Sequence, residues 1–308
     1  MEFDLIVRKG TIVDGTGRPR YRADLGLRDG RIAAIAQGEP LQAHADWILP
    51  LPDHEAILAP LLLQGVTTVV AGQCGFSPAP ITEAAIPLAD AYSEMMRERA
   101  FEYRWRSFGE FLDHLEQGSL LLNTACLVGH GALRHAVMGD STGAPDPGQL
   151  DDLRAGVRQA MAQGALGLSA GLAYAPGVFA RNDELLPLLR EVAEMGGVFT
   201  VHGRAYTWVS PFYKPMIGGR SHNIRSVREL LDLARRAGVR IQLSHQICVG
   251  RRTWRTHRTV LRDIERAVAD GLDVAFDAFP YTCGNTTINV VFPEWFLADY
   301  AHHIDDPG

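Results

Sequence analysis

Residues 198–202 read VFTVH, residues 226–237 read SVRELLDLARRA, and residues 241–245 read IQLSH. The first and last are short apolar runs of strand length, whereas the middle segment repeats its apolar residues at helical spacing. Ser226 and Glu229 form a capping-box pattern, which predicts a helix that begins at Val227 and ends before Gly238. A strand, a helix and a second strand in this order predict two parallel strands joined by a crossover helix.

The same alternation continues on both sides of this segment. Four further apolar runs of strand length lie at residues 66–71, 125–128, 166–169 and 274–279. One of the helices between them begins at Asp146-Pro147, with Gln149 completing the cap. Because no GxGxxG motif follows an early strand, the pattern favours a TIM-like (β/α)8 barrel over a doubly wound sheet.

The beginning of the chain has a different texture, in which short strand-like runs alternate with turns such as residues 14–17 (DGTG) and 29–30 (DG). This pattern predicts a small β-rich module of meandering strands. We therefore predict two domains. Residues 1–49 are the N-terminal part of a small β domain, and residues 50–308 are an α/β barrel domain.

The composition is that of a globular protein, with 46% hydrophobic and 21% charged residues. The 30 Lys and Arg against 36 Asp and Glu give a formal charge of −6, so no global basic field exists to bind nucleic acid or an anionic membrane. No stretch has the pattern of a targeting peptide or the apolar length of a membrane span, and we expect a cytoplasmic protein.

Three residues of types that bind zinc lie at the ends of predicted strands, namely Cys74, His202 and His245. In a parallel barrel the carboxyl ends of the strands converge on one face, so residues far apart in the sequence can meet there. One thiolate and two neutral imidazoles would form a zinc site with one position left for water. Taken singly, each residue is more often a packed cysteine or a hydrogen-bonded histidine, so the spacing alone leaves both interpretations open.

Six stretches of the sequence together resemble one known family: FDLIVRKGTIVDGTGRPRYRADLGLRDGRIAAI (3–35), QGVTTVVAGQCGFSPAP (64–80), GALGLSAGLAYAPG (164–177), VHGR (201–204), QLSH (242–245) and DAFPYT (277–282). This family is the D-aminoacylase (N-acyl-D-amino-acid deacylase) branch of the amidohydrolase superfamily, and GQCG is the most specific of its motifs. The resemblance implies a (β/α)8 barrel beside a small β-sandwich, with Zn2+ bound by Cys74, His202 and His245. It also implies metal-dependent hydrolysis of the amide bond of a small-molecule substrate, an N-acyl-D-amino acid, to a carboxylate and a D-amino acid.

The resemblance also implies substrate contacts. It places Tyr174 and Tyr281 against the acyl amide and the carboxylate of the substrate, although each could be an ordinary half-buried tyrosine. The family often has a lysine after the second histidine, where this sequence reads SHQI (244–247). The basic loop that follows is either a solvated helix entrance or the source of a replacement cation, and we expect Arg251 or Arg252 to bind the carboxylate.

Three further features concern the predicted rim of the barrel. The segment 203–225 is longer than usual for a connection between a strand and a helix, and it is either a lid or a loop without such a function. Asp277 closes the last predicted strand and is expected to brace the loop there. His130, in the motif VGHG, is interpreted as a structural residue.

The sequence departs from the family pattern in two places. No His-x-His pair occurs, and comparison with the pattern predicts that a strand and its loop are missing between Pro50 and Leu51. His54 lies nearby without a partner and receives no ligand role. The eighth strand, with the catalytic aspartate of the family, does not occur either, so no residue of this chain is assigned as catalytic. We therefore expect the real polypeptide to contain further segments.

Two other classes of function stay open from the sequence. One is a different amidohydrolase activity, such as that of a dipeptidase or of a cyclic amide or imide hydrolase. The other is a non-catalytic relative that binds a small acid. The sequence predicts no oligomeric state.

Overall fold

The computed structural model of the protein describes residues 5–12, 18–28, 31–37, 61–93, 102–117, 122–284, 286 and 288–299. The chain divides into two compact units, residues 1–60 and residues 61–308. The domain boundary that we predict between residues 49 and 50 lies outside the described residues, as does the predicted gap in the family pattern after Pro50. Both stay predictions.

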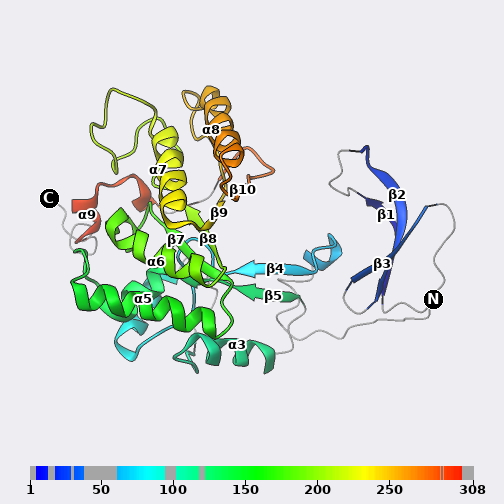
Figure 1. The fold of residues 1–308 in the computed structure, drawn as a ribbon, viewed down its shortest axis with the longest axis horizontal. Helices are drawn as coiled ribbons and strands as arrows, with labels where there is room; N and C mark the ends of the chain where they lie inside the picture. The colour runs from blue at the N-terminus through cyan, green and yellow to red at the C-terminus, as the bar shows by residue number, and fades with distance from the viewer. Residues whose placement is uncertain are drawn as a thin grey trace. The chain divides into compact units, whose positions relative to one another are not determined.

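The first unit contains an antiparallel sheet of three strands in the order β1-β2-β3 (Figure 1). The strands are β1 (Leu5–Ile12), β2 (Tyr21–Arg28) and β3 (Arg31–Ala36). Neighbours in the sequence pair with each other, which confirms the predicted meander. The predicted turns at residues 14–17 and 29–30 lie outside the described residues. Because the described part of this unit contains one sheet, the β-sandwich stays a prediction.

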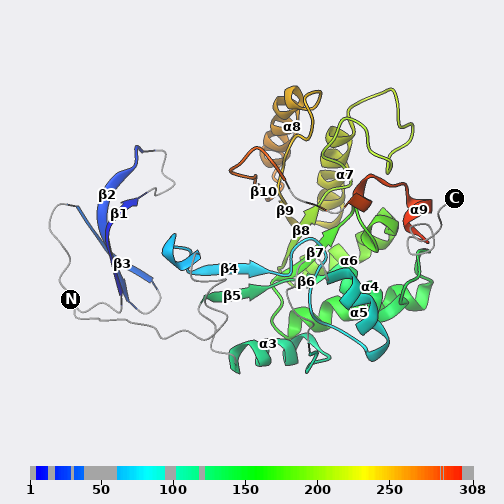
Figure 2. The ribbon, with the colours of Figure 1, turned by 180° about the vertical axis from the view of Figure 1, so that it is seen from behind.

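The second unit is built on parallel strands. β4 (Thr68–Ala71) pairs with β5 (Asn123–Cys126), and a five-stranded sheet has the order β10-β9-β8-β7-β6. Its strands are β6 (Val128–Gly129), β7 (Gly167–Gly171), β8 (Val198–His202), β9 (Arg240–Leu243) and β10 (Val274–Phe276). Only Leu127 separates β5 from β6 along the chain, and its amide donates to the carbonyl of Ala71 over 3.0 Å, which extends the pairing of β4 with β5 (Figure 2). All six predicted strand positions are confirmed.

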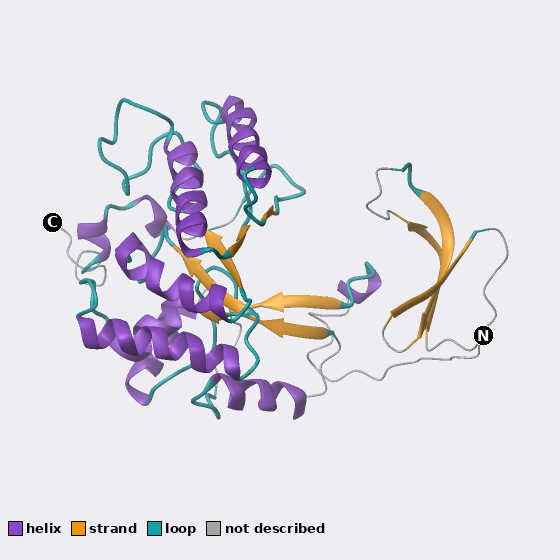
Figure 3. Ribbon diagram, in the orientation of Figure 1, coloured by secondary structure: helices purple, strands orange, loops and turns teal. Residues whose placement is uncertain are grey.

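Helices follow the strands along the chain and pack on the sheet (Figure 3). They are α2 (Ile86–Ser93), α3 (Phe108–Gln117), α4 (His130–Met138), α5 (Pro147–Ala162), α6 (Asn182–Glu194), α7 (His222–Ala237), α8 (His257–Ala269) and α9 (Glu294–Leu297). Short 3-10 turns lie at η1 (Glu83–Ala85), η3 (Gly177–Phe179), η4 (Trp254–Thr256) and η5 (Ile288–Val291). None of the helices in the described part of the chain is long and apolar enough to cross a bilayer.

The main core lies between the parallel sheet and these helices. Leu168 on β7, Phe199 on β8 and Ile241 on β9 are buried in one cluster with Leu185 on α6 and Leu233 on α7. Strands covered in this way are apolar along most of their length, which is why they are recognisable in the sequence. In the described residues β4 pairs with β5 and β10 pairs with β9, and β4 and β10 do not pair with each other. The structure therefore establishes an α/β fold with a parallel sheet, and the closed barrel stays a prediction.

The helix that joins β8 to β9, α7, starts earlier than the sequence predicts. It begins at His222, so the predicted start at Val227 is wrong. Ser226 lies inside the helix, where its hydroxyl accepts a hydrogen bond from the amide of Ala205 over 3.4 Å. Glu229 forms an ion pair with a buried arginine. Both side chains of the apparent capping box therefore make tertiary contacts instead of capping the helix.

The predicted cap of α5 is confirmed and allows a first quantitative test. Asp146 Oδ1 accepts from the amide of Gln149 over 2.9 Å, and Gln149 Oε1 accepts from the amide of Asp146 over 3.0 Å.

Asp146→Ala removes one of these two hydrogen bonds and is expected to lower the free energy of unfolding by about 1 kcal/mol, measured by urea denaturation. Asp152→Ala, an exposed position on the same helix, is the matched control and should change it by less than about 0.5 kcal/mol. Equal effects of the two substitutions would contradict the capping role.

Candidate metal centre

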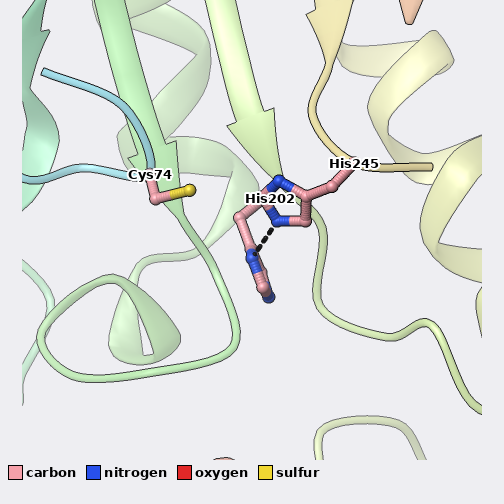
Figure 4. Close-up of side chains that lie close together, drawn as sticks. All are labelled: Cys74, His202 and His245. Atoms are coloured by element: carbon pink, nitrogen blue, oxygen red, sulfur yellow. Dashed lines mark hydrogen bonds between the residues drawn. The ribbon is translucent and has the colours of Figure 1, made fainter. Parts of the chain in front are cut away.

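The structure brings Cys74, His202 and His245 together at the carboxyl ends of three strands (Figure 4). Cys74 lies in the turn after β4, His202 is the last residue of β8, and His245 follows β9. Their sulfur and nitrogen ligand atoms all lie within 4.8 Å of one another, and all three side chains are partly buried. The three residues are thus close enough to share one ion, and their role as ligands stays a prediction.

The turn that carries Cys74 is bound to β7 by one hydroxyl group. Ser169 is fully buried, its Oγ accepts from the amide of Gly75 over 3.0 Å, and it donates to the carbonyl of Gly72. These two contacts bracket Cys74, whose φ of 57° lies in the left-handed region that a residue with a side chain rarely adopts. Ser169 therefore stabilises a strained turn at the point where the thiol must be presented.

Two glycines let this turn lie against the neighbouring strands. A Cβ atom on Gly129 would lie 2.4 Å from the carbonyl oxygen of Gly75, and one on Gly171 would lie 2.3 Å from that of Cys74. Both distances are far below van der Waals contact. The amide of Gly129 also donates to Ser77 Oγ over 2.9 Å. The absence of side chains at Gly129 and Gly171 is thus part of what positions the thiol.

The two histidines are in contact with each other. His245 Nε2 lies 2.5 Å from His202 Nδ1, and the ring centroids are 4.6 Å apart. Burial, and secondarily the proximity of His245, lowers the pKa of His202 to about 3. Burial also lowers the pKa of His245, although the carboxylate of Asp277 opposes this. Both rings are therefore neutral at pH 7, which is the form that binds metal ions.

The backbone of His245 is bound from the neighbouring strand. Its φ is 38°, and its amide donates to Asp277 Oδ1 over 2.6 Å. Gln242 donates to the second oxygen of the same carboxylate over 2.6 Å. Asp277 therefore braces the loop at the end of β9, whereas the sequence leads us to expect that it braces the loop after its own strand. With both oxygens in hydrogen bonds, this carboxylate positions the histidine backbone.

Tyr174 lies beside the cluster. The pKa of the Cys74 thiol is raised by burial, and a hydrogen bond with the Tyr174 side chain partly offsets this. The tyrosine ring packs 4.9 Å from the ring of His202 and 5.4 Å from that of Phe76. Tyr174 is buried, and its predicted contact with the substrate stays a prediction.

The other predicted substrate residues lie farther out. Tyr281 is 59% exposed and stacks on Phe279, which in turn stacks on His245, with centroid distances of 5.3 and 5.7 Å. Arg251 and Arg252 are exposed in the turn after β9, and neither guanidinium has an ion pair with the residues that the structure describes. The structure gives no contact between these arginines and the three clustered residues, so their role and that of Tyr281 stay predictions.

The first half of the long segment 203–225 is anchored. Arg204, which is buried, donates to the carbonyls of Val178 and Ala180 and pairs with Glu229. The amide of Ser210 donates to a ring nitrogen of the buried His222 over 2.8 Å. The first half of the predicted lid is therefore part of the packed structure, and its motion would require breaking these contacts.

Sequence reasoning missed two residues that contact this site, Ser169 and Tyr206. Both act through a hydroxyl group on the backbone of another segment, which no periodicity or spacing indicates. Ser169 stands within the GLSAG stretch that carries the family resemblance, and this is the only signal that could have drawn attention to it.

The residue types of the cluster fit a zinc ion. A thiolate and two neutral imidazoles are common ligands of catalytic zinc, and they leave a coordination position open. The raised pKa of the Cys74 thiol belongs to a buried sulfur without a cation beside it, and a divalent ion would favour the thiolate. The donor set and its burial are therefore consistent with a metal centre.

Comparisons with known proteins agree with this geometry. No protein-family model matches the chain. The D-aminoacylase of Alcaligenes xylosoxydans xylosoxydans is 33% identical to it over 303 residues, which cover 93% of this chain and 59% of that protein. A crystal structure of D-aminoacylase superimposes with a TM-score of 0.72 at 30% identity, covering 92% of this chain and 59% of that one. A structure of N-acyl-D-glutamate deacylase from Bordetella bronchiseptica, complexed with zinc and a phosphonate inhibitor, superimposes with a TM-score of 0.70 at 31% identity, covering 91% and 59%.

The parallel α/β unit is similar in fold to D-aminoacylase, whose crystal structure defines a subset of amidohydrolases. The identity extends over more than nine-tenths of the chain. The chain is a homologue of D-aminoacylase and of N-acyl-D-glutamate deacylase. It spans about three-fifths of the length of these relatives, with coverage of 59% in each case.

Proposed function

We propose that this chain is part of a zinc-dependent enzyme that hydrolyses N-acyl-D-amino acids to a carboxylate and a D-amino acid. The observation that carries the proposal is the cluster of Cys74, His202 and His245 at the carboxyl edge of the sheet, in a chain that is 33% identical to D-aminoacylase. The names of the relatives support the substrate class, and the zinc in the structure from Bordetella bronchiseptica supports the metal.

We also propose that strands β4 to β10 belong to a (β/α)8 barrel. Their parallel order follows the sequence, as it does in such barrels. Val70 on β4 and Phe276 on β10 are 46% and 43% exposed, although both are apolar. In an open sheet such edge strands leave backbone N–H and C=O groups unpaired and promote aggregation. Pairing with further strands would cover them.

The mechanism assigns distinct tasks to the residues of the cluster. Cys74, His202 and His245 would bind the metal, since they supply one sulfur and two neutral nitrogens. When bound, zinc supplies polarisation of the acyl carbonyl and a water of lowered pKa. Tyr174, buried against His202, would orient the acyl amide and exclude water from it.

The free carboxylate of the substrate requires a cation and a hydrogen-bond donor at the rim. We propose Arg251 or Arg252 for the cation, because a guanidinium can bind a carboxylate with two parallel hydrogen bonds. Tyr281, whose exposed ring continues the stack from His245 through Phe279, would supply the hydroxyl. No residue of this chain is assigned the proton transfer from water to the leaving amine.

The proposal is tested with the full-length gene product. We expect it to bind zinc, and to release free amino acid from N-acetyl-D-amino acids but not from their L-enantiomers, dipeptides or cyclic imides. Removal of the metal with a chelator should abolish turnover, and added zinc should restore it, as measured by ninhydrin-type detection of free amine. Zinc binding without turnover would point to a binding protein, and turnover of a dipeptide or imide alone would replace the substrate class.

A further inference from the structure

The residue Tyr206 connects the two histidine-bearing loops through its hydroxyl group. It lies in the turn after β8, four positions beyond His202. Its hydroxyl accepts from the amide of Gly203 over 2.9 Å and donates to the carbonyl of Ser244 over 2.9 Å. Gly203 directly follows His202, and Ser244 directly precedes His245. One oxygen atom therefore contacts the backbone adjacent to both histidines.

This hydroxyl continues the pairing of β8 and β9 beyond the end of the sheet. The amide of Ser244 donates to the carbonyl of Val201 over 3.0 Å, which is a backbone contact between the two segments at this point. Farther out, the amide of Val249 donates to the carbonyl of Tyr206 over 2.9 Å. The Tyr206 hydroxyl spans the region between these two contacts, which lies just beyond His202 and just before His245.

The ring of Tyr206 contacts both histidines as well. It meets the ring of His202 edge to face at a centroid distance of 4.9 Å and lies 5.6 Å from the ring of His245. Because the backbone of His245 is in the left-handed region, at a φ of 38°, its orientation depends on such side-chain contacts more than on the regular sheet. Asp277 binds its amide from one side, and Tyr206 binds the preceding carbonyl from the other.

We infer that Tyr206 is a positioning residue that sets the relative orientation of His202 and His245 for metal binding. The inference rests on the proposed function in one respect, that these two histidines bind a metal ion. The hydroxyl acts on backbone groups, since its one hydrogen is donated to Ser244 and it accepts from Gly203. It therefore serves the site through geometry and has no part in proton transfer.

The experiment compares two tyrosine-to-phenylalanine variants of the full-length protein. Tyr206→Phe keeps the ring and removes the hydroxyl. The matched control, Tyr213→Phe, lies in the same segment, and its buried hydroxyl donates to Glu229, away from the two histidines. Zinc affinity is measured by competition with a chelator, and the Co2+-loaded proteins are compared by their visible absorption, which reports the geometry of the ligands. Denaturant unfolding of the metal-free proteins measures any loss of stability separately.

We expect Tyr206→Phe to lower zinc affinity about 10–100-fold, the range seen when residues that orient metal ligands are removed, and to shift the cobalt absorption bands. Tyr213→Phe should bind as the wild type does. Unchanged affinity and spectrum in Tyr206→Phe, a loss equal to that of Tyr213→Phe, or a variant that no longer folds without metal would overturn the inference. In those cases the proposed function stands, whereas a wild-type protein that binds neither zinc nor cobalt overturns both.

Discussion

Replacing His202 by asparagine is expected to abolish zinc binding and, with it, hydrolysis of N-acyl-D-amino acids by the full-length protein. The substitution removes one of three ligand atoms that lie within 4.8 Å of one another. Loss of a ligand should exceed the 10–100-fold loss of affinity typical of outer partners, so we expect a decrease of more than about 1000-fold. Zinc content after dialysis and the rate of amino acid release measure the two effects.

The matched control for this experiment is His114→Asn. His114 lies on α3, where its ring packs 5.0 Å from Trp105, and it has no contact with the three clustered residues. This variant should retain zinc and activity. Retention of stoichiometric zinc by His202→Asn would show that the cluster is not the metal site, and the proposed function would then lose its main support.

Replacing Glu184 by glutamine is expected to lower the free energy of unfolding by about 3–5 kcal/mol at pH 7, the range for breaking a buried ion pair. Glu184 Oε1 lies 2.8 Å from His130 Nε2 and 3.6 Å from Arg134 Nε. All three side chains are buried, with side-chain exposures of 2%, 0% and 1%. Removing the carboxylate leaves the guanidinium without its charge partner in the interior. Denaturant unfolding measures the loss.

The pH dependence of stability gives this prediction a second readout. Burial raises the pKa of Glu184, but its hydrogen bond with His130 and its electrostatic interactions with His130, Arg134 and Arg204 outweigh this, so the pKa is lowered overall. A carboxylate with a lowered pKa stabilises the fold above its unfolded pKa of about 4.3, and this contribution is lost as the pH falls through the folded value. The stability difference between wild type and Glu184→Gln should therefore be constant from pH 7 to about 5 and decrease below about pH 4.

Glu194→Gln serves as the control, because Glu194 is exposed on the same helix, α6. It should change the free energy of unfolding by less than about 0.5 kcal/mol. A comparable, small effect of both substitutions would show that the buried network contributes little.

The network also contacts the site, since Arg134 donates to the carbonyl of Pro176 in the loop that follows Tyr174. His130 belongs to this buried network, and its structural role stays a prediction.

The strands were predictable because burial on both faces requires continuous apolar runs, and VFTVH at residues 198–202 is such a run. The proximity of His202 and His245 was predictable as well, because each lies at the carboxyl end of a strand and parallel strands end on the same edge of the sheet. The start of α7 was not predictable from Ser226, because its hydroxyl contacts Ala205 in a segment without periodicity. The ligand roles depend on the family resemblance, since the spacing of the three residues alone left a structural interpretation open.

The contacts that orient the site were beyond sequence reasoning for a different reason. Ser169 and Tyr206 each bind backbone groups of a distant segment, and such bonds exist only once the chain has folded. Closure of the sheet into a barrel could not be predicted from local pattern either. It depends on what pairs with β4 and β10, which have exposed apolar residues. Local pattern predicts each strand, whereas closure depends on partners for both edges.

The hydroxyl of Ser169 bonds the backbone of Gly72 and of Gly75, and so fixes the turn of Cys74 before any metal ion is bound. The turn around Cys74 is fixed by β7 and by the close approach of Gly129 and Gly171, so its shape is established by the protein alone. The conformational entropy of this loop is therefore lost when the protein folds, and binding of an ion does not have to order the loop. If Cys74 binds a metal ion, as proposed, exchange of one divalent ion for another would require no refolding of the turn.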